Sequence, residues 1–542
     1  MRKETRISIM RRWLVAGGIT LFGLAVAAAL TLTVFATKLK AAARARVETY
    51  LAARFESDVH FTDFDVALWP EPSATIDGLD LTLQGRTDVP PLIRIRRVTL
   101  GTTAFGLFKK HIYISSVRLE GLQLTMPPKA SGARPQIHAS NLDLAQKYPV
   151  FIKQINADGA LITVMRSDPR KEPREFPIEH LHIENFSFDG PANFQAQLTN
   201  AIPKGEIDSE GQFGPWIPDE PRQIPVNASY LFKNADMGTL RGLSGTMRST
   251  GKFSGPLDFL NVQGETDIPD FALRMSAHPV ALHTDFSAIV DGTNGNVILK
   301  PVVAHFRHTT LVVNGEVADL TKQKGRTIIL AVNSKEARIE DLLFLTVRNE
   351  PPIMNGDAKI TAEMEIAEGD ADLMQKLAVS GRFDVADARF ASESAQEKID
   401  SLSRRAQGHP QDPTIDDVVS DLKGSFGLKN GVMNFPDLSF SVTGAAVQLH
   451  GTYGMDSGEM DFHGHLLMQA KLSQTMTGTK SFFMKAVDPF FKGKNGGSSV
   501  PIKITGTKDR PQYGLDLGGS KKEQKGGNGS KSDSQPAGKH NP

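Results

Sequence analysis

Residues 112–119 read Ile-Tyr-Ile-Ser-Ser-Val-Arg-Leu, and this stretch contains the pattern that decides the fold. Ile112 and Ile114 lie two residues apart, as expected for one face of a β-strand, and Val117 and Leu119 continue the alternation in shifted phase. The same shift occurs at Ile93, Ile95, Val98 and Leu100. A shift of this kind indicates a β-bulge, which adds twist and bends the strand. The sequence therefore predicts a sheet that curves.

Composition extends this prediction to most of the chain. The 542 residues include 48 glycines and 31 prolines, with short apolar alternations between them, which favours many strands and turns. The length predicts two or more structural units. We expect a mainly β protein with a few helices, in which a single N-terminal transmembrane helix precedes a long, curved, twisted antiparallel β-sheet groove. The net charge of +1 gives no footprint for nucleic acid.

The transmembrane helix is predicted from residues 13–37. Trp13 to Thr37 contain no charged side chain, and a run of this length is sufficient to cross a bilayer core. A cleavable signal peptide is the alternative, but the run is long for one, and Thr31 to Ala36 only loosely resemble a cleavage site. We expect an uncleaved anchor.

The flanking charges favour a cytoplasmic N-terminus. Five basic residues and one acid, Glu4, precede the run, although further basic residues follow it. The chain has no cysteine, which is compatible with an oxidising compartment. We therefore expect a single-pass protein of the bacterial inner (plasma) membrane, with the bulk of the chain in the periplasm.

Hydrophobic periodicity and composition divide the rest of the chain. Residues 38–58 are predicted to form a juxtamembrane helix, with an apolar face that caps the following sheet or, alternatively, lies at the membrane surface. The predicted segments are 1–12 cytoplasmic N-terminus, 13–37 transmembrane helix, 38–58 juxtamembrane helix, 59–126 N-terminal β unit, 127–137 linker, 138–384 central β-groove, 385–410 helical insertion, 411–517 C-terminal β region with a helix at 473–492, and 518–542 disordered tail.

Two helices are predicted to interrupt the later strands. The first runs from about Ser392 to Gln407, with a capping box from Ser394 to Glu397 and Gly408 as its stop. The second spans residues 473–492 and carries an apolar stripe. That stripe either packs onto the sheet or contacts lipid. Its candidate lipid contacts are Phe482, Phe483, Phe490 and Phe491.

A short phrase of an aliphatic residue, a polar residue and glycine recurs at irregular intervals, which excludes a strict solenoid repeat. We expect each of these glycines to lie where a strand ends or bends. They are Gly245, Gly264, Gly315, Gly381, Gly444, Gly451 and Gly506.

Catalytic and metal-binding motifs are absent from the sequence. It contains no Walker A, G-x-S-x-G or H-E-x-x-H motif and no cysteine-based metal pattern. His463 and His465 would share one face of a strand, but no third ligand is near in sequence, and His305 and His308 would point to opposite sides. The acidic pair at 416–417 fits a solvated loop. We expect a non-enzymatic protein without cofactor or metal.

Function must then follow from shape. A curved sheet with an aliphatic inner face either closes on itself or leaves an apolar trough, and an acyl chain is the ligand that such a trough would hold. The candidate lipid-contacting strand residues are Ile93, Ile95, Ile112 and Ile114.

Both ends of the chain resemble a known family. The segments that carry the likeness are Leu68-Trp-Pro70, Ile76-Asp-Gly-Leu-Asp-Leu81, Pro90-Pro-Leu-Ile-Arg-Ile95, Val117-Arg-Leu-Glu-Gly-Leu-Gln-Leu124, Gly424-Ser-Phe-Gly-Leu-Lys-Asn-Gly431, Val500-Pro-Ile-Lys-Ile-Thr-Gly-Thr507 and Pro511-Gln-Tyr-Gly514. In this order they are similar to the AsmA-like family of bacterial envelope proteins, related to TamB and to repeating β-groove lipid-transfer proteins. The resemblance implies a periplasmic β-rich body and no catalytic residue.

Two non-enzymatic functions remain open. The first is lipid handling, in which the protein binds phospholipid acyl chains along its groove. The second is assembly or scaffolding, in which exposed sheet edges act on other envelope or outer-membrane proteins by strand addition. An enzyme is the third alternative, and it would require buried titratable groups in one cleft.

Overall fold

A computed structural model describes residues 40–516, with breaks at 53–54, 56, 68–71, 84–89, 103–111, 127–149, 166–172, 218–220, 241, 277, 320–324, 349–350, 370, 372, 477–487, 494–495 and 509. The predicted anchor, N-terminus, linker 127–137 and tail 518–542 therefore lie outside the described residues. Within them, no helix has the length and apolar character needed to cross a membrane. The described chain is mainly β, as the sequence predicts.

The chain divides after Gly381 into two compact units. Strands of unit 1 are β1 (Ser57–His60), β2 (Asp63–Ala67), β3 (Ser73–Leu83), β4 (Ile93–Gly101), β5 (Ile112–Ile114), β6 (Ser116–Glu120), β7 (Gln123–Met126), β8 (Val150–Val164), β9 (Arg174–Ser187), β10 (Ala192–Ala201), β11 (Lys204–Phe213), β12 (Pro225–Asp236), β13 (Leu243–Ser244), β14 (Thr246–Pro256), β15 (Leu260–Leu273), β16 (Val280–Val290), β17 (Val297–Phe306), β18 (Thr309–Ala318), β19 (Thr327–Arg338) and β20 (Met354–Ile366). Short 3-10 turns lie at Pro221–Gln223 and Met237–Thr239, and the four-residue helix α4 spans Leu373–Lys376.

The boundary between the units falls inside β21 (Leu377–Phe390). Unit 2 also contains β22 (Ser420–Lys429), β23 (Val432–Val442), β24 (Ala445–Gly454), β25 (Glu459–Met468), β26 (Ser498–Thr507) and β27 (Arg510–Leu515). From β22 onwards each strand pairs antiparallel with the next.

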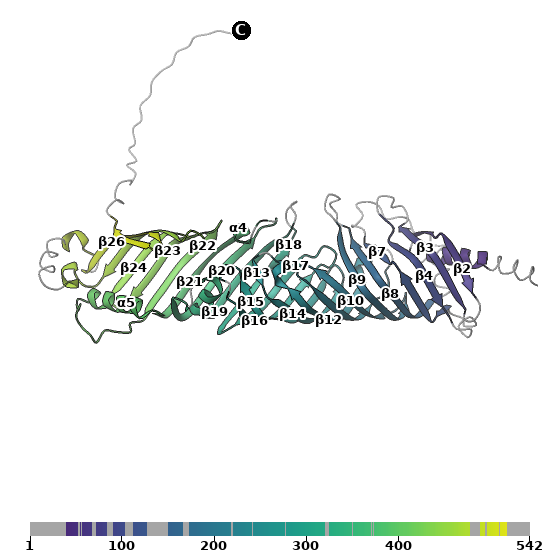
Figure 1. Cartoon of the computed structure of the whole chain (residues 1–542), viewed down its shortest axis with the longest axis horizontal. Helices are drawn as coiled ribbons and strands as arrows, with labels where there is room; N and C mark the ends of the chain where they lie inside the picture. Colours follow the sequence, from purple (N-terminus) through teal and green to yellow (C-terminus); the bar gives the residue numbers. More distant parts are fainter. Residues whose placement is uncertain are drawn as a thin grey trace, which may run out of the picture. The chain divides into compact units, whose positions relative to one another are not determined.

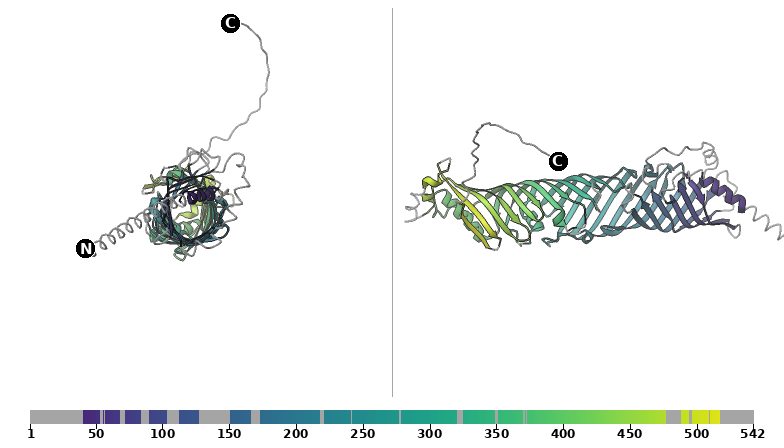
Figure 2. Two further views of the ribbon diagram at one scale, coloured as in Figure 1. Left: turned by 90° about the vertical axis from the view of Figure 1, so that its right-hand side faces the viewer. Right: turned by 90° about the horizontal axis from the view of Figure 1, so that it is seen from above.

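Most strands of unit 1 also pair antiparallel with their neighbours in sequence, and Figures 1 and 2 show β8 to β19 side by side in chain order. The exception is β8, which lies parallel to β5, β6 and β7. Register shifts occur within most of the later pairs, for example between Asp285 and Ala288. Such bulges add twist to the sheet.

The phase shifts seen in the sequence correspond to a shared kink. Gly78, Gly121 and Gly159 have φ of 63°, 65° and 68°, a left-handed conformation that glycine adopts without steric cost. The paired residues on both sides of each glycine keep the same offset, so the strands kink together and no residue is inserted. The bulge predicted in β4 is therefore wrong in detail, although the change of face between Ile95 and Val98 is confirmed. At residues 112–119 the strand breaks at Ser115 into β5 and β6.

A helix at residues 40–52 covers the first strands of unit 1, as predicted (Figure 2). Its apolar face, which includes Val47 and Leu51, packs against a core cluster built from β2 to β9. Phe55 continues this face and lies 5.5 Å from Phe188 and 5.8 Å from Trp216, between ring centroids. Edge-to-face contacts of this kind add to the apolar burial. The capping role of this helix is confirmed.

The helix α5 (Glu393–Ala406) in unit 2 also confirms a prediction. Its residues Ile399, Leu402 and Ala406 pack on a second core cluster formed by β23 to β26. Gly408, with φ of 83°, ends it as expected. The predicted capping box is wrong, because the N-cap is Ser392 and its side chain makes no cap hydrogen bond. The helical part is shorter than 385–410, since β21 continues to Phe390.

The predicted α-helix at 473–492 is wrong at both described ends, which form the 3-10 turns η4 (Leu472–Thr475) and η5 (Asp488–Phe491). Asp488 accepts hydrogen bonds from the backbone N–H and the hydroxyl of Ser473, at 2.9 and 2.7 Å. Pro489 follows, and the residue before proline is disfavoured in the helical conformation. Residues 477–487 between these turns are outside the described part.

The sequence pattern missed α3 (Ile339–Thr346), an eight-residue helix between β19 and β20. Its Asp341 is fully buried and accepts from Arg307 Nε at 2.9 Å, the backbone N–H of His308 at 2.8 Å and Thr309 Oγ1 at 3.0 Å. The Arg307 guanidinium also lies 4.4 Å from the ring centroid of Phe344. One carboxylate therefore fixes α3 to the β17–β18 turn.

Candidate functional site

One face of strands β12 to β20 carries three rows of apolar residues that run across the strands. We call it the central apolar face and define it by three cross-strand rows. The first contains Leu260, Val290, Val297, Val317, Ile328 and Ile366. The second contains Ala228, Phe253, Val262, Ala288, Leu299, Gly315, Leu330 and Met364. The third contains Val302, Val313, Val332 and Ala362.

Residues in each row are direct partners in the strand ladders, so their side chains are in contact range from strand to strand. Val262 faces Ala288, Ala288 faces Leu299, and Leu299 faces Gly315. The alternation of side chains along a strand places all of them on one side of the sheet. The rows therefore form a continuous apolar surface.

Most large side chains of this face are partly exposed, in contrast to the cores near the two helices. Phe253, Leu299 and Leu330 each keep part of their surface in contact with solvent. The buried core cluster of unit 1 lies instead in β2 to β9, under the helix at residues 40–52. Apolar area that remains exposed in a regular array is unfavourable in water and is typical of binding surfaces.

Several of the recurring glycines, which the sequence predicts to lie where a strand ends or bends, are inside strands and not at their ends. Of the recurring phrases, Gly264, Gly315, Gly381 and Gly451 are inside strands β15, β18, β21 and β24. A Cβ at Gly264 would lie 3.1 Å from Phe286 Cζ and 2.3 Å from the carbonyl oxygen of Thr250. These glycines give space to a neighbouring strand or aromatic ring. Gly245 and Gly444 lie outside the strands, as predicted.

A small hydroxyl cluster lies on the same face, outside the three apolar rows. Ser249 donates to the carbonyl oxygen of Glu265 at 2.9 Å, and Thr266 donates to the Ser249 hydroxyl at 2.9 Å. The Tyr230 hydroxyl lies 3.2 Å from the same oxygen. Burial raises the pKa of Tyr230, so the phenol stays neutral at physiological pH. The cluster satisfies its own hydrogen bonds and adds no charge to the face.

The opposite face of the same strands is polar and carries cross-strand ion pairs. Lys233 Nζ lies 2.8 Å from Asp208 and 3.6 Å from Glu206, and Arg338 pairs with Asp357. The hydrogen bond to Asp208 raises the pKa of Lys233. Exposed pairs of this kind contribute little stability, but they keep this face in water.

The residues singled out in the sequence fall mainly outside the central apolar face. Ile93 and Ile95 are 8% and 6% exposed and belong to the core under the first helix, and Ile114 packs against it. The side chain of Ile112 is outside the described set. Phe491 packs against the core of unit 2. Phe482 and Phe483, and the side chain of Phe490, are not in the described part.

The histidine pairs do not form a joint site. His463 and His465 share one face of β25, as predicted, but both ring nitrogens of His463 are taken by carboxylates, Nδ1 by Asp516 at 2.8 Å and Nε2 by Asp461 at 3.0 Å. These bonds raise the pKa of His463. His305 Nδ1 lies 3.0 Å from Thr310 Oγ1 at the end of β17. The acidic pair at 416–417 lies in a loop, where Asp417 pairs with Arg389.

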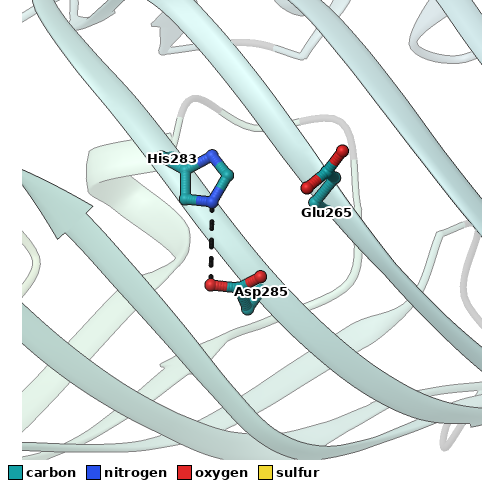
Figure 3. A group of neighbouring side chains, drawn as sticks. All are labelled: Glu265, His283 and Asp285. Atoms are coloured by element: carbon teal, nitrogen blue, oxygen red, sulfur yellow. Dashed lines mark ion pairs between the residues drawn. The ribbon is translucent and has the colours of Figure 1, made fainter.

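The polar face contains one group of ligand type that the sequence analysis missed. Glu265, His283 and Asp285 come from β15 and β16, and their ligand atoms lie within 4.8 Å of one another (Figure 3). The spacings Glu-x-Asp and His-x-Asp in the two strands were visible in the sequence. Only the strand register, which places Glu265 opposite Asp285, shows that they meet.

No protein-family model matches the chain, and neither a curated protein nor a solved structure does.

Proposed function

We propose that this chain is an inner-membrane-anchored periplasmic protein of the AsmA-like kind, which binds phospholipid acyl chains on the central apolar face and helps to transfer them. The observation that carries the proposal is the series of apolar residues that face one another from strand to strand across the face, most of the large ones partly exposed. The resemblance at both ends and the uncharged run from Trp13 to Thr37 support the anchor and the compartment. The role is non-enzymatic.

The dimensions of the face fit an acyl chain. From Phe253 in β14 to Met364 in β20, the second row crosses six strand spacings, and at about 4.8 Å each this gives roughly 29 Å. One leaflet of a bilayer core is about 15 Å thick, so the row exceeds the length of a lipid tail in a membrane. Each methylene group removed from water contributes about 0.8 kcal/mol. An acyl chain would therefore gain substantially by lying along this row.

Photocrosslinking tests the proposal with neighbours that serve as controls. A benzophenone amino acid at position 299 or 330 samples the central apolar face. The same probe at 298 or 329 samples the polar face, where the native isoleucines are 52% and 39% exposed. We expect lipid adducts from intact cells at 299 and 330 only. Equal labelling at all four positions, or none at 299 and 330, would refute a specific lipid-binding face.

A second function, assembly of envelope proteins by strand addition, is favoured by β27. All six of its residues are exposed, including Tyr513 at 75% and Leu515 at 48%, and its only partner among the described strands is β26. An unpaired edge can accept another strand through main-chain hydrogen bonds. Pro511 removes one donor from this edge and restricts the pairing.

The two functions respond to different substitutions. Lysine at Tyr513 and Leu515 would oppose strand addition at β27, because edge charges block it. If scaffolding is the function, the double variant should lose capture of partner proteins and keep its lipid adducts at position 299. If lipid transfer is the function, the variant should retain activity in envelope assays.

A further inference from the structure

The polar face of β15 and β16 carries four ligand-type side chains in two adjacent cross-strand pairs. Glu265 is the direct partner of Asp285, and Asp267 is the direct partner of His283. The alternation of side chains puts all four on the same side of the sheet, away from Val262 and Ala288. The group is therefore separate from the central apolar face.

Charge in this group is unbalanced. In other cross-strand pairs an acid faces a base, as Asp80 faces Arg94 and Asp357 faces Arg338. Where Asp63 faces Asp77, Lys40 and Arg97 supply the compensating cations. Within the described residues, no lysine or arginine nitrogen lies within 4 Å of the three carboxylates of this group, and a protonated His283 would balance only one of their three charges. Like charges directly opposite each other destabilise a strand pair unless a cation compensates them.

The imidazole of His283 is oriented for ligation. Its Nδ1 lies 2.7 Å from Asp267 Oδ1, so Asp267 holds the ring and leaves Nε2 on the side of Asp285, 3.6 Å from its Oδ2. Figure 3 shows Glu265 on the neighbouring strand, and its carboxylate has an oxygen within 4.8 Å of the ligand atoms of His283 and Asp285. A carboxylate that fixes the second nitrogen is the usual outer partner of a metal-bound histidine. The same bond raises the pKa of His283.

We propose that Glu265, His283 and Asp285 bind a divalent transition-metal ion of the zinc class, with water completing the coordination and Asp267 as the positioning residue. One nitrogen and two carboxylate oxygens suit zinc, whereas magnesium and calcium prefer oxygen ligands alone. The ligand atoms, within 4.8 Å of one another, must approach to about 3.4 Å for bonds of roughly 2.1 Å. The exposed carboxylates can rotate to do so. The ion would join β15 to β16.

The test is a calorimetric titration of metal-stripped full-length protein with Zn²⁺. We expect His283→Gln, and separately the double change Glu265→Gln with Asp285→Asn, to remove one equivalent of binding. His180→Gln is the matched control, because His180 bonds Asp158 in the same way, at 2.8 Å, but belongs to no group of three ligands among the described residues. Far-ultraviolet circular dichroism checks that each variant is folded.

Asp267→Asn separates positioning from ligation. It should weaken binding by about 10- to 100-fold and keep the stoichiometry, as removal of an outer carboxylate does at other sites. Unchanged stoichiometry and affinity in His283→Gln would overturn the proposal. An equal loss in His180→Gln would also overturn it, because that result indicates non-specific binding by surface histidines.

Discussion

Replacing Leu299 by aspartate gives the sharpest test of the lipid-binding face. Leu299 lies in the second row between Ala288 and Gly315, and its side chain is partly exposed. Without lipid, the new carboxylate can remain hydrated at the surface. With an acyl chain along the row, the same carboxylate would be covered by hydrocarbon.

The expected loss of lipid-binding free energy follows from comparing the lipid-free and lipid-bound states. Full burial of a leucine contributes about 1.5 to 3 kcal/mol, so the lipid-covered part of Leu299 accounts for about 1 kcal/mol. Covering an unpaired carboxylate costs several kcal/mol more. A total of at least about 3 kcal/mol corresponds to roughly a 100-fold loss of lipid affinity. In the lipid-free protein, we expect a destabilisation of only about 1 to 2 kcal/mol.

The assay measures fluorescent phospholipid binding and thermal melting for the same samples. Ile298→Asp is the control, because Ile298 is the adjacent residue on the polar face and is 52% exposed. It faces Glu316, so the control also loses some stability through like-charge repulsion. Lipid binding should fall only in Leu299→Asp. Equal lipid affinities for the two variants would refute the reasoning.

Three further predictions concern single residues. In denaturant titrations, Asp341→Ala should lower the free energy of unfolding by about 3 to 5 kcal/mol, because it leaves buried donors without an acceptor. The control Asp357→Ala, at an exposed ion pair, should lower it by less than about 1 kcal/mol. Similar losses for the two variants would contradict the role of Asp341. Gly264→Val should reduce the melting temperature, because its Cβ meets the backbone 2.3 Å away, and unchanged melting would show that the strands can move apart. The hydrogen bond to Asp267 raises the pKa of His283, so this interaction stabilises the fold fully below the unfolded pKa of about 6.5 and is lost as the pH rises through the folded pKa. Asp267→Asn should therefore lower the pKa of His283 in an NMR titration. An unchanged pKa would exclude Asp267 as the cause.

Features of the fold that depend only on a local sequence pattern, such as helical periodicity or a helix-ending glycine, could be predicted. The periodicity of Val47, Leu51 and Phe55 predicted the first helix and the side that it buries. Gly408 predicted the end of α5. The helix α3 was missed because its apolar run, Leu342 to Leu345, is short, and a buried strand would also show such a run.

Features that depend on how the strands align with one another could not be predicted from local patterns. The phase shifts were visible, but the shared kink at Gly78, Gly121 and Gly159 requires the strands to be aligned. Ile93 and Ile95 have the pattern expected of a ligand-facing strand, yet the helix at residues 40–52 and its neighbours bury them. Apolar alternation predicts which face avoids water, but it does not tell whether protein or ligand covers that face.

The alternation of strands keeps the two proposed sites chemically independent. In β15, Val262 and Gly264 belong to the apolar side, and Glu265 and Asp267 to the polar side. A substitution on one side changes neither the charge nor the apolar area on the other. If His283→Gln abolished lipid capture as well as zinc binding, the common cause would have to be loss of the β15–β16 pairing itself, and the melting temperature would fall with both.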